Sequence, residues 1–168
     1  MHVNPTAEAA YGGRVRVRVG ALVLDERQPA VLLVEHAGIW TPDPFWTPPG
    51  GGVHFGEALD EALRREVREE TGLEVDVGPL RYVLDFVRPP LHAVSFYFEC
   101  RAPAGLAALA PGRDPELAAD RQVSRCVRFV GCDELAALQV DPEGRAEWLQ
   151  ADAPGGFPAG TRYVGTLR

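Results

Sequence analysis

The chain has 168 residues, 46% of them hydrophobic and 24% charged, which is the composition of an ordinary globular domain. Its formal net charge of -7 argues against binding to a nucleic acid polymer, which requires a basic surface. It does not exclude a nucleotide substrate, because a bound metal ion can offset the local negative charge. No apolar run is long enough to span a membrane and no signal-peptide pattern is present, so we expect a cytoplasmic protein.

The length predicts one domain over residues 14–168, preceded by a flexible N-terminal tail at 1–13. Within the domain, strict alternation of arginine and valine from residue 14 predicts a half-buried strand that continues to residue 24. An apolar run at 30–35 predicts a second, central strand. A loop rich in proline, glycine and aromatic residues follows at 36–52.

A helix is predicted over about residues 57–71. The next stretches are typical of strands, at 73–87 and 91–101, with the turn Arg88-Pro89-Pro90 between them. Residues 102–121, rich in alanine, proline and glycine, form a long predicted loop. A late strand and two short helices are predicted after it, at 123–130, 133–138 and 142–150. One long helix inserted among strands predicts an α+β fold or an α/β/α sandwich.

The three cysteines, Cys100, Cys126 and Cys132, are odd in number and lack the spacing of a metal or disulfide framework. We interpret them as buried, reduced thiols. A reducing compartment fits this interpretation.

The predicted helix has one apolar stripe for packing against the sheet, made of Leu59, Ala62, Leu63 and Val67. Three glutamates, Glu66, Glu69 and Glu70, lie at the edge of that stripe and share one turn at the helix C-terminus, where Gly72 predicts the stop. Their mutual repulsion, their partial burial and the helix dipole all make this placement unfavourable.

A hard divalent cation with oxygen ligands would relieve this unfavourable placement of the glutamates, which indicates Mg²⁺ (or Mn²⁺). Arg65 can pair with Glu69 one turn later, but a single arginine cannot neutralise three glutamates. The competing interpretation is a solvated, charge-laced helix face without a ligand. The preceding run Pro48-Pro49-Gly50-Gly51-Gly52 allows close backbone approach to a ligand, although three glycines alone also fit a plain turn.

Together these residues resemble the signature of the Nudix hydrolase family, with all of its fixed positions matched. The signature requires glycine, glutamate, a central Arg-Glu-x-x-Glu-Glu run and a closing glycine. The chain supplies these as Gly51, Glu57, Arg65-Glu66-Val67-Arg68-Glu69-Glu70-Thr71-Gly72-Leu73. The resemblance implies an α/β/α sandwich around a mixed β-sheet, with the motif helix packed against it.

The resemblance also implies an activity and a set of site residues. The activity is metal-dependent hydrolysis of a phosphoanhydride bond in a nucleoside diphosphate linked to another moiety. Glu66, Glu69, Glu70 and the Gly50 carbonyl correspond to metal ligands of the family. Glu57 and Arg65 correspond to the pair that joins loop to helix and orients the glutamates.

The general base stays open between Glu69, Glu116, Asp120 and a histidine such as His54. His54 departs from the family pattern, in which that position is usually acidic. A lone histidine is more often structural than catalytic.

Aromatic residues of the 36–52 loop are candidates for stacking on a nucleotide base. Trp40 and Phe45 are the better candidates, whereas Trp46 is expected to pack in the core under the motif. Arg88, together with Arg16, Arg18 and Arg81, is a candidate for binding phosphate or ribose, although arginines on strands are more often plain surface.

Prolines at 89 and 90 favour ADP-ribose as substrate, because a proline near that position is common in relatives that cleave ADP-ribose. The alternatives are a dinucleoside polyphosphate, an (oxidised) nucleoside triphosphate, or a catalytically inactive nucleotide-binding sensor. The intact set of motif glutamates argues against the sensor. The sequence leaves a homodimer open.

Overall fold

The computed structural model describes residues 12–25, 27–36, 43–103, 109–110, 124–140 and 145–167. Its strands form two sheets, one with the order β1-β5-β4-β7 and one with the order β3-β2-β6. The elements are β1 Val15–Val23, β2 Ala30–His36, β3 Phe45–Thr47, α2 Leu59–Thr71, β4 Asp76–Arg88, β5 Leu91–Arg101, β6 Ser124–Gly131, the 3-10 turns η2 Leu135–Ala137 and η3 Ala153–Gly155, α3 Arg145–Asp152 and β7 Arg162–Leu167.

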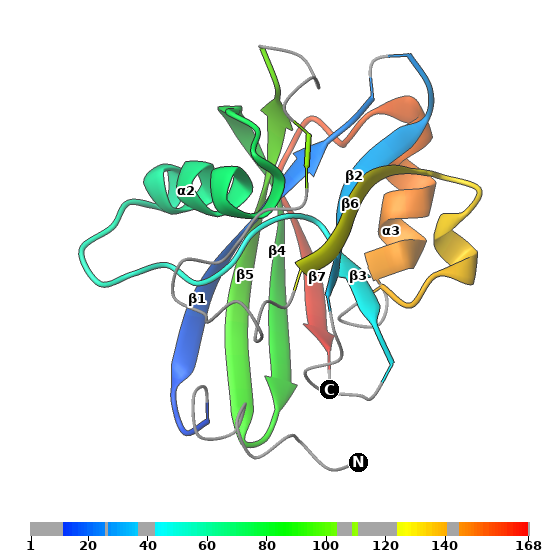
Figure 1. Ribbon diagram of the computed structural model, residues 1–168. Helices are drawn as coiled ribbons and strands as arrows, with labels where there is room; N and C mark the ends of the chain where they lie inside the picture. The colour runs from blue at the N-terminus through cyan, green and yellow to red at the C-terminus, as the bar shows by residue number, and fades with distance from the viewer. Residues whose placement is uncertain are drawn as a thin grey trace.

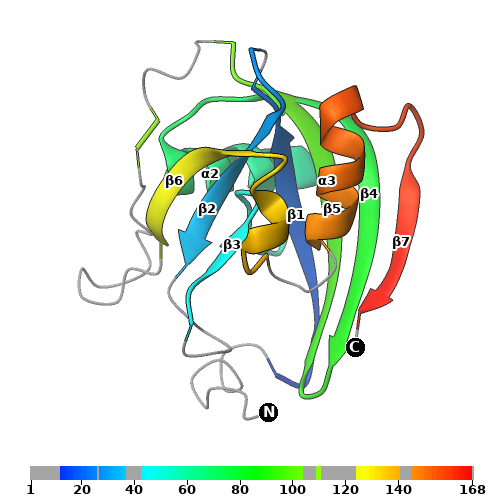
Figure 2. The same cartoon turned by 90° about the vertical axis from the view of Figure 1, so that its right-hand side faces the viewer.

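The four-stranded sheet is mixed. β5 pairs with β1 in parallel and with β4 in antiparallel, and β7 pairs with β4 in parallel. In the smaller sheet β2 pairs with both neighbours in antiparallel. The two sheets lie between α2 on one side and α3 on the other (Figure 1). In Figure 2 the three-stranded sheet occupies one flank and β7 the opposite edge. The predicted α/β/α sandwich is therefore confirmed.

Two apolar clusters fill the layers, and alternate residues of β1 and β2 supply both. The α2-side core contains Val19, Ala21, Val23, Leu32, Val34, Ala62, Leu63, Val67, Leu73, Val75, Cys100 and Val127. The α3-side core contains Leu22, Val31, Leu33, Trp46, Tyr82, Leu84, Tyr97, Val130, Cys132, Leu135, Val140, Trp148, Leu149, Ala153 and Phe157. Because β2 is buried on both faces, its apolar run identified it as a central strand.

The motif helix follows the sequence prediction closely. The carboxylate of Glu61 accepts a hydrogen bond from the Ala58 amide (3.2 Å), which satisfies one of the free donors at the helix start. At the other end Gly72 adopts the left-handed conformation (φ 71°) and its amide bonds to the Arg68 carbonyl at 3.0 Å. Of the apolar stripe, Ala62, Leu63 and Val67 are buried as expected, and Leu59 is partly buried. None of the helices in the described ranges is long and apolar enough to cross a membrane.

The structure corrects several sequence predictions. The predicted loop 36–52 contains β3, which was missed because three residues are too short to show alternation. The final strand β7 was also missed, since Gly165 interrupts its pattern. The predicted helix at 133–138 is only the 3-10 turn η2. Most of the predicted tail 1–13 and of the loop 102–121 lies outside the described residues.

The three cysteines are free thiols, as predicted, with Cys100 and Cys132 buried and Cys126 half-buried. Burial raises the pKa of the Cys100 thiol to about 12, so this side chain stays protonated at neutral pH.

Candidate functional site

Arg65 lies at the centre of the candidate site. Its Nε and Nη2 bind the two carboxylate oxygens of Glu57 at 2.8 and 2.9 Å, and Nη2 also donates to the Gly52 carbonyl at 3.0 Å. Its Nη1 donates to Glu66 at 2.9 Å and to Glu69 at 3.4 Å. These five contacts use all five N–H donors of the guanidinium group. Arg65 therefore fixes two helix glutamates and the glycine segment, the run from Pro48 to Gly52, in one geometry.

Glu57 joins the segment before α2 to the helix itself. Besides the forked pair with Arg65, its Oε2 accepts the His54 amide at 3.0 Å. The hydrogen bonds from Arg65 lower the pKa of Glu57 to about 2, so its carboxylate is ionised throughout the neutral range. Because the Glu57 carboxylate stays charged, its two hydrogen bonds hold the Arg65 guanidinium in one orientation.

The Glu66 carboxylate is the most tightly enclosed of the helix glutamates. Burial raises its pKa, and the charges of Arg65 and Arg18 only partly offset this effect. A Cβ atom added at Gly51 would overlap all three atoms of this carboxyl group. Glycine at position 51 thus allows the backbone to lie directly against Glu66.

Glu70 is held from a different direction, by the glycine segment and by β2. The Gly50 amide donates to Glu70 Oε2 at 2.8 Å. His36 Nε2 lies 3.7 Å from Glu70 Oε1 and 3.2 Å from the Thr47 hydroxyl, and the His36 ring stacks on Phe45. The end of β2 and the glycine segment therefore converge on one glutamate.

Glu69 is the least constrained of the three. Its side chain is 26% exposed, against 15% for both Glu66 and Glu70. Its contact with Arg65, at 3.4 Å, is also the longest that this arginine makes. Glu69 is accordingly the glutamate with most freedom to exchange partners.

The chemistry of these donors suits a hard divalent cation, since they are carboxylate oxygens packed against a backbone segment that a side chain would block. Among the described residues, no three acidic, histidine or cysteine side chains already converge closely enough to hold an ion. Glu66 is turned toward Arg65 and Glu70 toward the Gly50 amide. A cation would compete with these donors for the same oxygens.

A family model described as the NUDIX domain matches residues 14–157. The chain belongs to the Nudix family. The match covers all the elements that build the site, from β1 to α3.

Curated relatives match this Nudix domain over short stretches. An RNA pyrophosphohydrolase from Acinetobacter baylyi is 46% identical over 54 residues, which are 26% of this chain and 32% of the relative. Nudix hydrolase 2 from Arabidopsis thaliana is 33% identical over 61 residues, 36% of this chain and 22% of the relative. The chain thus spans a third or less of the length of these relatives.

Solved structures share the fold over most of the chain. A NUDIX hydrolase from Nitrosomonas europaea superposes with a TM-score of 0.65 at 22% identity, covering 90% of this chain and 78% of that one. An ADP-ribose pyrophosphatase from Streptococcus suis superposes with a TM-score of 0.63 at 18% identity, covering 90% and 98%. At these identities the likeness shows the fold alone.

The aromatic candidates lie in the interior of the Nudix domain. Phe45 is 4% exposed and stacks on His36. Trp46 is 8% exposed and belongs to the α3-side core, with Arg128 over its ring. The expectation that Trp46 packs in the core is therefore confirmed, but its place under the motif is wrong, because its side chain lies on the face of the sheets away from α2. Trp40 lies outside the described residues.

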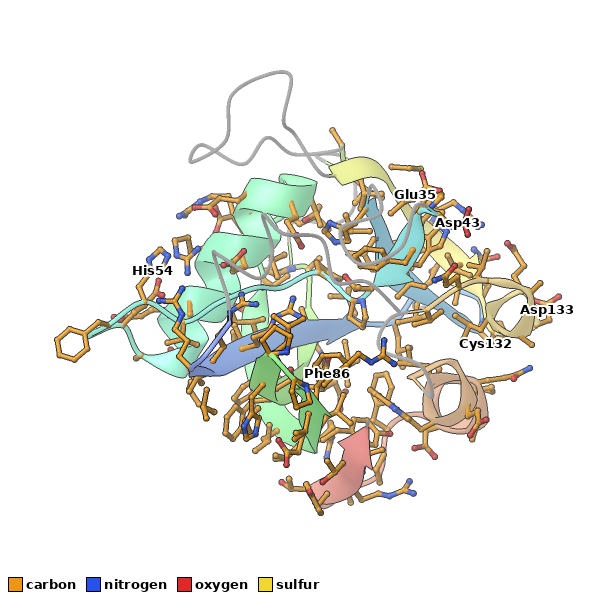
Figure 3. The ribbon with its side chains drawn as sticks, turned by 90° about the horizontal axis from the view of Figure 1, so that it is seen from below. Glu35, Asp43, His54, Phe86, Cys132 and Asp133 are labelled. Carbon is orange, nitrogen blue, oxygen red and sulfur yellow. The ribbon has the colours of Figure 1, made fainter. Side chains whose placement is uncertain are left out.

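The remaining candidates are spread more widely. His54 is 54% exposed, and Figure 3 shows it at the outer end of the segment that enters α2. Arg88 lies near the end of β4, with its guanidinium 5.5 Å from the centre of the Phe86 ring. Glu116 and Asp120 lie outside the described residues.

Sequence reasoning did not foresee the contact between His36 and Glu70. The two residues are far apart in the chain, and no local spacing relates them. The observation that could have singled out His36 is its place at the end of a central strand next to the glycine segment.

Proposed function

We propose that the chain hydrolyses a phosphoanhydride bond in a nucleoside diphosphate linked to another moiety, with Mg²⁺ or Mn²⁺ as cofactor. The observation that carries the proposal is the arrangement around Arg65. All five N–H donors of this arginine form hydrogen bonds, which join Glu57, the glycine segment and two helix glutamates. Several partly buried carboxylates at a helix C-terminus destabilise the fold, because they repel one another and the helix dipole opposes their charge. This arrangement therefore has no structural benefit of its own.

In the proposed site Glu66, Glu69 and Glu70 hold the ion, and the Gly50 carbonyl contributes a backbone oxygen. The bound ion supplies charge stabilisation for the phosphoryl oxygens and the leaving phosphate. Arg65 and Glu57 keep the glutamates in place. Glu69, the most exposed and least tied of the three, accepts the proton of the attacking water.

ADP-ribose is the substrate that we propose first. Pro89 and Pro90 after the motif favour it, and the Streptococcus suis structure that shares the fold is an ADP-ribose pyrophosphatase. Nucleoside triphosphates are the second candidate, because nucleoside triphosphatase NudI of Escherichia coli is 63% identical over 27 residues, 19% of its length. A catalytically inactive sensor is disfavoured, since no motif glutamate has been replaced.

The test is a panel of nucleotides incubated with the protein and Mg²⁺, with the products separated by chromatography. The expected result is AMP and ribose phosphate from ADP-ribose, and loss of turnover in Glu69→Gln. Glu74→Gln is the matched control, because Glu74 is an exposed glutamate just beyond the helix whose carboxylate lies 3.5 Å from Arg68. Absence of hydrolysis of every nucleotide in the panel would refute the proposed activity.

A further inference from the structure

A second arginine beside the glycine segment has a buried donor without a partner. The Nε atom of Arg18, on β1, is inaccessible to solvent and makes no hydrogen bond within the described parts of the chain. Buried polar groups in folded proteins are nearly always hydrogen-bonded, so an unpaired buried donor beside a candidate site marks a place where a ligand or a water molecule can bind.

Arg18 lies directly against the glycine segment. It forms an isolated antiparallel bridge with Gly52, and the backbone on either side is hydrogen-bonded to the same segment, from Val53 to Val17 and from Val19 to Gly51. Alternation along β1 sets the direction of its side chain. Val19 and Ala21 face α2, so Arg18 and Leu22 face the opposite side, toward the α3-side core.

Arg65 and Arg18, two of the arginines near Gly52, differ in how their donors are used. Arg65 donates to the Gly52 carbonyl and has no donor left over. Arg18, on β1, pairs with the same residue through a backbone bridge, and its Nε has no partner among the described residues.

Phosphate is a group that fits a buried arginine donor beside the glycine segment. A guanidinium group makes forked, charge-assisted bonds to phosphate oxygens, and a phosphate shared with the ion brings opposite charge to Arg18. The neighbouring positions on the same sheet face support a nucleotide. Pairing places Arg18 beside Ser95 and Leu84, and the next row carries Arg16, Ala93 and Phe86. Phe86 lies near the centre of the view in Figure 3, which looks at this end of the sheet.

We propose that Arg18 binds a phosphate group of the substrate on the side of the glycine segment away from Arg65. The proposal deepens the proposed function, on which it rests for the identity of the ligand. It assigns Arg18 a role in binding, while Arg65 acts only as a positioning residue.

The test measures binding of α,β-methylene-ADP, a diphosphate that cannot be hydrolysed at that linkage, and of adenosine, which has no phosphate. Calorimetry in the presence of Mg²⁺ compares the wild type with Arg18→Met, which keeps an apolar stem, and with Arg18→Lys, which keeps the charge but not the fork. Arg68→Met is the control for the lost charge, because Arg68 is 57% exposed on the outer face of α2.

The expected result is an increase of about 10- to 100-fold in the Kd for α,β-methylene-ADP in Arg18→Met, with a smaller increase in Arg18→Lys. Adenosine should bind equally to all variants, and melting temperatures should match the control, since the buried Nε of Arg18 has no hydrogen-bond partner among the described residues. The proposal is overturned if Arg18→Met weakens binding no more than Arg68→Met does, if adenosine binding falls equally, if both Arg18 variants fail to fold, or if the wild type does not bind the analogue.

The outcome separates this inference from the proposed function. A wild-type protein that binds the analogue through Arg18 but hydrolyses no nucleotide would refute the activity and retain the phosphate contact. A protein that hydrolyses nucleotides and binds the analogue without Arg18 would refute only the contact.

Discussion

Substitution of Gly51 by alanine should damage the site without damaging the fold. The added Cβ atom would overlap the Glu66 carboxyl group, and no backbone atom is among its nearest neighbours. The clash is therefore relieved by rotation of one flexible side chain. Because burial already opposes the charge of Glu66, moving this carboxylate toward solvent should change the free energy of unfolding by less than about 1 kcal/mol.

The effect on activity should be much larger. To restore ordinary van der Waals contact the carboxylate must move by about 1 Å, and a misplacement of that size in a catalytic group costs on the order of 10²-fold in rate. The same movement breaks the 2.9 Å contact between Glu66 and Arg65. We expect kcat to fall by about 10²-fold and the Mg²⁺ concentration for half-maximal rate to rise.

The neighbouring glycines provide matched controls. A Cβ atom at Gly52 would meet only the Arg16 guanidinium at 3.5 Å, an ordinary contact, so Gly52→Ala should retain most of the activity and stability. Gly50 has a φ of 151° and its Cβ would overlap the Val19 carbonyl, so Gly50→Ala should destabilise the fold itself. Chemical denaturation and steady-state kinetics at varied Mg²⁺ measure both properties for all three variants. Equal activity in Gly51→Ala and Gly52→Ala would contradict the reasoning.

Other expected outcomes concern the metal, the ion pairs and the core. Glu70→Gln should lower kcat by at least ~10³-fold with the fold intact, as checked by kinetics and circular dichroism. Mg²⁺ at a hundredfold excess over its Kd should stabilise the native state by about 2.7 kcal/mol, and a melting curve unchanged by Mg²⁺ would contradict binding. Glu57→Gln should cost about 2 kcal/mol at neutral pH by unpairing Arg65. Since the folded pKa of Glu57 is lowered from 4.5 to about 2, this difference should be complete above pH 4.5 and shrink as the pH falls toward 2, measured by denaturation at each pH. Tyr82→Phe, which loses the bond to Asp152, should lower the melting temperature by roughly 5 °C and leave kcat unchanged.

The motif helix was predictable because its determinants are local. Its apolar stripe, the glycine that ends it and the crowding of glutamates at its last turn are all properties of one short stretch. The same stretch contains the pair of Arg65 with Glu69 at one turn of separation. The residues of this stretch therefore located α2 and the cluster of three glutamates, and the resemblance to the Nudix signature assigned these glutamates as proposed ligands.

The partners supplied from elsewhere in the chain were not predictable. The contact of His36 with Glu70 depends on the packing of β2 beside α2, and the free donor of Arg18 depends on how the glycine segment lies along β1. Trp46 was assigned to the wrong layer, because its strand β3 pairs with β2 in a sheet that no pattern in a three-residue element could reveal. Side-chain direction in such a short strand is fixed by its neighbours rather than by its own sequence.

The glycine segment also determines where the sheet stops growing. β1 is the edge strand of the four-stranded sheet, and its outer side is occupied by hydrogen bonds from Val53 to Val17, from Val19 to Gly51 and from Ala21 to Pro49. An unpaired strand edge can pair with a strand of another chain. The glycine segment covers this edge, and its two prolines lack the backbone N–H groups that a further strand would need for pairing. Variants that displace this segment, such as Gly50→Ala, should therefore expose the unpaired edge of β1 and also disrupt the candidate site. Self-association, visible by light scattering, would then accompany inactivity, so that solubility and catalysis are constrained by the same few residues.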